Sequence, residues 1–128
     1  MATKQKDLYD LHTDHKAWLS ELALYEDELK IMKNRLGEVS IKNTSSEVKV
    51  QVEQFQNRFI IQLNELAILK KAVNVEEREL QSEIVSNPVA VDHRKAEDDE
   101  ALRERVETFE ALFESLKTEF NQFAASWL

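Results

Sequence analysis

The chain of 128 residues contains no cysteine, one glycine and one proline. Without cysteine, a disulfide framework, thiolate chemistry and a cysteine-based zinc site are all excluded. A single glycine also rules out a glycine-rich phosphate-binding loop, and the scarcity of both residues leaves little material for sheets or tight turns. The composition therefore favours one soluble helical domain, residues 1–128, with few interruptions.

Long apolar runs and a basic face are missing as well. No run approaches the roughly 20 residues of a membrane-spanning helix, and the first residues lack the apolar core of a signal peptide. The formal net charge is −8, from 17 Lys and Arg against 25 Asp and Glu. Nucleic-acid binding needs basic side chains that displace counterions from phosphates. We therefore expect a cytoplasmic protein with neither a membrane nor a nucleic acid as partner.

Apolar residues recur at alternating steps of three and four in three segments, which keeps one side of each helix apolar. In the first segment these residues are Leu8, Leu11, His15, Trp18, Leu22, Tyr25, Leu29, Met32 and Leu36. In the second they are Val48, Val52, Phe55, Phe59, Leu66, Leu69, Val73 and Leu80, and in the third Leu102, Val106, Phe109, Phe113, Leu116, Phe120, Phe123 and Trp127.

The pattern predicts helices over about 6–36, 45–86 and 88–127. Gly37 stands where a left-handed C-terminal cap is expected, so residues 38–43 are predicted to be a loop. Thr44 and Glu47 match a capping box at the start of the second helix.

The start of the third helix is open to two interpretations. Asn87 as cap with Pro88 at the first helical position gives this helix a length similar to the second, and we favour it. A start at Asp92 or near Ala96 is the alternative, because the acidic residues 97–100 suit a first helical turn.

Short connections make consecutive helices antiparallel neighbours, which predicts an all-α, up-down-up three-helix coiled-coil bundle. In this register Leu36 is expected near Val48, and Phe120 near Phe55.

A second apolar line flanks the main one on the first two helices and suggests a partner interface. Its residues are Leu24, Ile31, Ile61, Ile68 and Val75. The register places Leu24 level with Ile60, so these side chains are expected to form one patch for self-association or for a partner helix. The alternative is that they merely widen the buried face of the bundle.

His12 and His15 are the only candidates for metal binding, since they lie one helical turn apart with Asp14 between them. His15 also falls on the apolar line, where a lone polar residue serves to fix the register of packed helices. The residues three positions before each histidine are not glutamates, so the di-iron bundle signature is absent. We therefore assign no metal and no cofactor.

No arrangement of nucleophile, base and acid is visible, so no catalytic residue is assigned and no enzymatic activity is expected. The acidic residues from Glu97 to Glu110 are typical of a solvated helix face.

Two segments resemble known families. Ala17-Trp18-Leu19 in a first helix of three is similar to the opening helix of spectrin-type repeats, which implies architecture only. The stretch Val52-Glu53-Gln54-Phe55-Gln56-Asn57-Arg58-Phe59 resembles small uncharacterised helical proteins of bacteria, and that likeness implies no activity or site residues.

The leading hypothesis is therefore a non-enzymatic bundle that acts through contact with a protein partner or with itself as a homodimer. The main alternative is a metal-binding bundle that uses His12, His15 and neighbouring carboxylates. A third is a ligand carrier with a cavity among the large aromatic residues of the core, Phe55, Phe59, Phe109 and Phe113.

Overall fold

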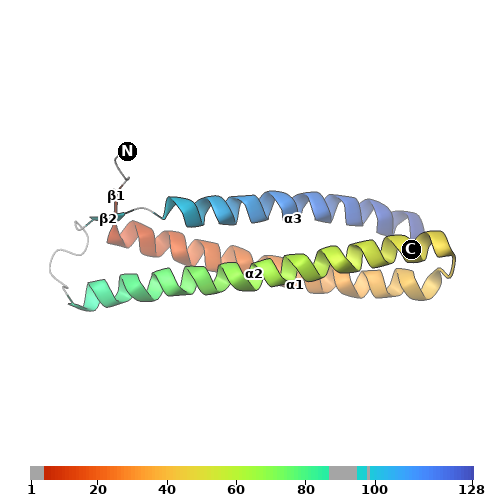
Figure 1. Ribbon diagram of the computed structural model, residues 1–128, viewed down its shortest axis with the longest axis horizontal. Coiled ribbons are helices and arrows are strands. Elements are labelled where there is room, and N and C mark those ends of the chain that lie inside the picture. Colours follow the sequence, from red (N-terminus) through yellow and green to blue (C-terminus); the bar gives the residue numbers. More distant parts are fainter. Residues whose placement is uncertain (1–4, 87–94, 98) are drawn as a thin grey trace.

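In the computed structural model, described here for residues 5–86, 95–97 and 99–128, three long helices lie side by side (Figure 1). Helix α1 spans Leu8–Lys42, α2 spans Ser46–Ser86 and α3 spans Glu100–Trp127. The chain runs along α1, back along α2 and forward again along α3 (Figure 1). The predicted all-α, three-helix bundle is confirmed. Among the described residues no helix is long and apolar enough to cross a membrane.

The predicted apolar lines form the core. Every residue on them is buried apart from Tyr25, Val52 and Trp127, which are partly buried. The rings of Phe55 and Phe120 lie 5.5 Å apart in an edge-to-face arrangement, as the register predicts. Such contacts between large aromatic and aliphatic side chains supply most of the free energy that holds helices together.

The predicted end of the first helix at Leu36 is wrong, because Gly37 lies inside α1 and residues 38–42 continue it. Val39 is completely buried, so one more turn of helix adds apolar contacts that outweigh the cost of about 1 kcal/mol for a mid-helix glycine. The helix ends at Lys42 instead. The side-chain Nδ2 of its C-cap residue, Asn43, donates to the carbonyl oxygens of Val39 and Trp127 at 3.0 Å each.

The second helix ends at Ser86 as predicted, but a single cap hydrogen bond, one residue later, replaces the predicted capping box of Thr44 and Glu47. Ser45 precedes α2, and the Val48 backbone N–H donates to Ser45 Oγ at 3.5 Å. Leu36 and Val48, expected to be neighbours, belong to the same buried cluster. Leu36 also lines a hollow with Val52 and Phe59.

The predicted third helix over 88–127 is wrong at its start, since α3 begins at Glu100. The alternative start near Ala96 is closer. Residues 87–94 and 98 lie outside the described residues, and with them the predicted Asn87 cap and Pro88 start.

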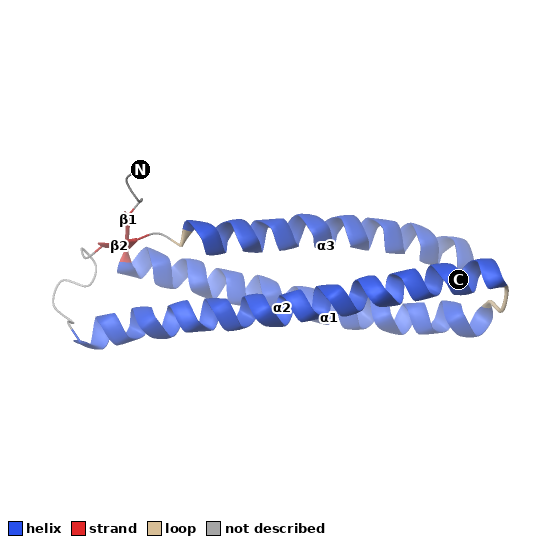
Figure 2. Ribbon diagram, in the orientation of Figure 1, coloured by secondary structure: helices blue, strands red, loops and turns tan. Residues whose placement is uncertain are grey.

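A short strand pair, which no sequence pattern predicted, joins the segments that precede α1 and α3. Strand β1 (Gln5–Asp7) pairs antiparallel with β2 (Lys95–Glu97), with Lys6 opposite Ala96 (Figure 2). Three residues are too few to show an alternating pattern, so only the approach of two distant segments reveals these strands. The pair ties the start of α1 to the segment before α3.

Candidate functional site

His15 is the one buried polar residue of the described core, with 1% of its surface exposed. Its Nε2 lies 2.6 Å from Asp99 Oδ2, and its Nδ1 lies 3.2 Å from Glu77 Oε1. These contacts connect α1 to the middle helix and to the residue that precedes α3. The predicted role in fixing the helix register agrees with this position.

His12 joins the same network one turn earlier. Its Nδ1 lies 2.7 Å from Glu77 Oε2, so a single carboxylate contacts both imidazoles. Ionised carboxylates only accept hydrogen bonds, and a neutral imidazole donates from one nitrogen. With carboxylates against both of its nitrogens, His15 needs a second proton on its ring or on a neighbouring carboxyl.

Glu77 contacts Nδ1 of both histidines, and Asp99 contacts Nε2 of His15. Among the described residues, no three histidine or acidic side chains are placed to hold a metal ion. The metal alternative for His12 and His15 therefore has no geometric support.

The Asp99 carboxylate is used for tertiary contacts and not for capping α3. It makes no side-chain cap hydrogen bond, although it occupies the N-cap position. Burial raises the pKa of the neighbouring Glu76 carboxyl, and the charge of Asp99 raises it further. Close by, Asp14 accepts from Lys6 Nζ at 2.8 Å and from Arg103 Nη2 at 2.9 Å. This end of the bundle is a dense structural network of charged groups.

A second polar cluster, which no sequence pattern predicted, lies between α1 and α3. The Tyr25 hydroxyl donates to Glu110 Oε1 at 2.9 Å, while its ring lies 4.6 Å from that of Phe113. Partial burial of the Glu21 carboxyl and its hydrogen bond with Glu110 raise the pKa of Glu21 to about 7. The pKa of Tyr25 is also raised, chiefly by burial and then by Glu110. Glu21 and Tyr25 are one turn apart in sequence, but only the tertiary register brings Glu110 to them.

All five residues predicted for a partner interface are exposed, so they do not widen the core. The exposed fractions are 57% for Leu24, 59% for Ile31, 62% for Ile61, 53% for Ile68 and 39% for Val75.

These five residues do not form one surface. Leu24 and Ile31 lie one turn either side of Glu28, which pairs with Lys117 of α3 at 3.0 Å, so they lie toward the α1/α3 side. Ile60, expected beside Leu24, instead lines a hollow between α1 and α2.

The other three residues line the α2/α3 groove, which consists of two adjoining hollows of about 790 and 550 Å³. The hollows share Ile68, and Leu112 of α3 lies in the first of them. Gln62 lines the groove as well, and its Oε1 is buried with no hydrogen-bond partner among the described residues. The groove thus combines an apolar wall with an unsatisfied acceptor.

Acidic residues predominate along the α2/α3 groove. Two basic residues, Lys71 and Arg105, also line it, and Arg105 lies 3.7 Å from Glu65. The acidic lining residues are Glu65, Glu76, Asp99, Glu100 and Glu104.

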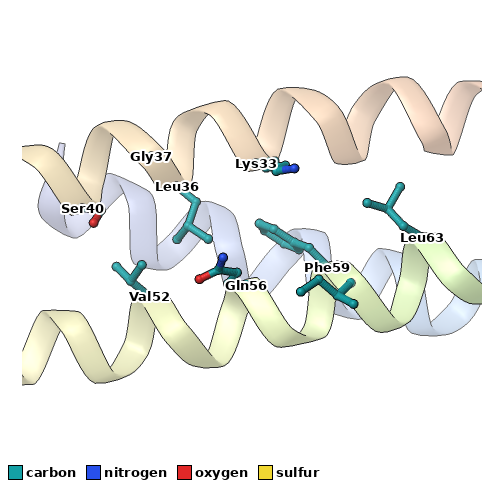
Figure 3. A pocket seen from close by; sticks show the side chains of 9 residues that line it. Lys33, Leu36, Gly37, Ser40, Val52, Gln56, Phe59 and Leu63 are labelled. Atoms are coloured by element: carbon teal, nitrogen blue, oxygen red, sulfur yellow. The ribbon is translucent and has the colours of Figure 1, made fainter.

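A separate hollow of about 310 Å³ lies between α1 and α2, here called the Gly37 pocket (Figure 3). It is lined by Lys33, Leu36, Gly37, Ser40, Val52, Gln56, Phe59, Ile60 and Leu63. The side chains of Leu36 and Phe59 point into the space between the two helices (Figure 3).

Comparison with known proteins finds no family model that matches the chain, and no similar curated protein or solved structure.

Proposed function

We propose that the protein is a non-enzymatic interaction module that binds a partner helix along the α2/α3 groove. The observation that carries this proposal is the line of Ile61, Ile68 and Val75, exposed at intervals of seven residues on the groove wall. Seven residues of helix rise about 10.5 Å, so the line extends about 21 Å along α2. An apolar face of a partner helix matches a line of this length and spacing.

Leu112 supports the same site from the opposite wall. Its side chain is 55% exposed on α3, in the hollow that also contains Ile61 and Ile68. Covering half-exposed side chains of this size contributes about 1 kcal/mol each to binding, before the costs of association. Apolar residues on both walls favour an occupant that lies in the groove and contacts both helices.

The charges around the groove favour a basic partner. Five acidic residues line it against two basic ones, and the whole chain carries a formal charge of −8. The buried Gln62 Oε1 calls for a hydrogen-bond donor, which Lys and Arg side chains supply. A second copy of the chain brings the same excess of negative charge, so a different, basic protein fits better.

Leu24 and Ile31 belong to a different side of the bundle and are not part of this site. We retain them as exposed apolar residues without an assigned partner.

The test uses a fluorescently labelled amphipathic peptide helix of leucine and lysine, titrated with the full chain while anisotropy is measured. We expect saturable binding that weakens at least about tenfold in Ile68→Glu, because a carboxylate replaces an apolar contact. Ile41→Glu is the matched control: Ile41 is 83% exposed, lies outside the groove, and the substitution makes the same change of charge.

The control separates groove binding from simple charge attraction. If the peptide binds through charge alone, both variants strengthen binding equally, and the proposal fails. Sedimentation velocity of the chain alone tests the other occupant. A dimer that Ile68→Glu dissociates and Ile41→Glu preserves would assign the groove to a second copy and overturn the choice of a basic partner.

A further inference from the structure

We propose that the Gly37 pocket binds a small amphipathic anion, with its charged head at Lys33 and its apolar body between α1 and α2. The site is independent of the α2/α3 groove, because the two share no lining residue.

The pocket has the size and lining of a small-molecule site. Its volume of about 310 Å³ lies at the lower end of the range for ligand pockets. Leu36 and Phe59 are buried at its base, and Val52 and Leu63 are partly buried beside them. An alkyl or aryl group that packs against these side chains is removed from water, which favours binding, and the helices do not need to move.

One charged side chain sets the chemistry of the ligand. Lys33 is the only ionisable residue in the lining, and it has no ion-pair partner among the described residues. The remaining polar side chains, Ser40 and Gln56, are neutral. Ser40 lies toward the other end of the pocket from Lys33, and Gln56 lies between them (Figure 3). A cation beside an apolar surface attracts a negatively charged head and repels a positive one.

Gly37 keeps the α1 wall of the pocket open. It is the only glycine of the chain and lies within a helix, where glycine is unfavourable. A Cβ atom built at this position meets nothing within 4 Å. A larger side chain at position 37 therefore fills the pocket without forcing α1 away from α2.

This property gives a direct test that does not rely on unfolding. Decanoate, below its micelle concentration, is titrated into the full chain by isothermal calorimetry. We expect one saturable site, with affinity reduced at least about tenfold in Gly37→Leu. Gly37→Ala is the matched control, since it raises helix propensity but adds a single methyl group, and it should retain binding within a few-fold.

The charge of the ligand is tested separately. Lys33→Gln should weaken decanoate binding about tenfold and leave binding of neutral decanol unchanged. Lys16→Gln makes the same change of charge at an exposed position of α1 outside the pocket, and it should leave decanoate binding unchanged. Thermal melting of each variant verifies that the bundle is folded.

Three results overturn the proposal. The first is the absence of saturable decanoate binding. The second is binding that Gly37→Leu leaves intact, which places the ligand elsewhere. The third is an equal loss in Lys33→Gln and Lys16→Gln, which shows that only the total charge matters.

Discussion

His15 Nε2 and Asp99 Oδ2 lie 2.6 Å apart, although 84 residues separate them in the sequence. Asp99 is the N-cap residue of α3, so this contact fixes the start of the third helix to the buried side of the first. Glu77 of α2 contacts the other ring nitrogen. One imidazole therefore holds all three helices in register at the end where the strand pair lies.

We predict that His15→Leu destabilises the protein by about 2–3 kcal/mol at neutral pH, because two largely buried carboxylates, Glu77 and Asp99, each lose a hydrogen bond to the imidazole. The side chains of Glu77 and Asp99 are 16% and 18% exposed, so water replaces the lost contacts poorly. Urea denaturation followed by circular dichroism measures the change. His12→Leu is the control: its side chain is 33% exposed, and a cost below about 1 kcal/mol is expected. Equal effects of the two substitutions would contradict the central role of His15.

The raised pKa of Glu21 predicts a pH-dependent stability. Since this pKa is about 7 in the folded protein against 4.5 ordinarily, the folded state binds more protons between these values. The contribution of Glu21 to stability is therefore complete below about pH 4.5 and lost as the pH rises through about 7.

Glu21→Gln should remove this dependence, because the amide donates to Glu110 at every pH. We expect the variant to be more stable than the original protein at about pH 8. The gain should be less than about 1 kcal/mol, since most of the Glu21 residue is exposed although its carboxyl is partly buried, and water screens the repulsion. The midpoints of urea denaturation of both proteins, measured from about pH 5 to about pH 8, give this difference in stability. Glu107→Gln, at an exposed position, is the control for the change of charge, and a matching gain there would refute the assignment.

Gly37→Ala should stabilise the bundle by about 0.5–1 kcal/mol. The backbone at Gly37 is part of α1, and the added methyl group meets no atom within 4 Å. Thermal melting of the two proteins compares them directly. A lower melting temperature in the variant would show that glycine is required there for the conformation of the helix.

The neighbours Phe113 and Leu112 should respond very differently to truncation. Phe113 is fully buried between the helices, so Phe113→Ala should cost about 3–5 kcal/mol through lost contacts and a cavity. Leu112 is 55% exposed, so Leu112→Ala should change stability by no more than about 0.5 kcal/mol. Denaturant midpoints measured on both variants check the difference. A large loss in Leu112→Ala would mean that α3 is rotated from the position described here.

The candidate sites were only partly predictable from the sequence. The second apolar line was visible as Ile61, Ile68 and Val75 at intervals of seven, and these residues are exposed as an interface requires. Their predicted grouping with Leu24 and Ile31 into one patch is not what the structure has. The spacing of residues within one helix does not determine which neighbouring helix lies beside each of its sides. The unpaired Gln62 oxygen and the Gly37 pocket depend on how two helices pack, so no local sequence pattern predicts them.

The sequence by itself determined three amphipathic helices and the residues of their shared core, because a spacing of three and four places apolar side chains on one side of any helix. The local sequence patterns that usually mark helix ends predicted two of these ends at the wrong residues. Gly37 suggested a cap, but burying Val39 favours continuing α1 to Lys42. Tertiary structure alone decided the strand pair, the register that brings His15 to Asp99, and the grooves between helices. These features join segments far apart in the chain, and their energy exists only once the helices have packed.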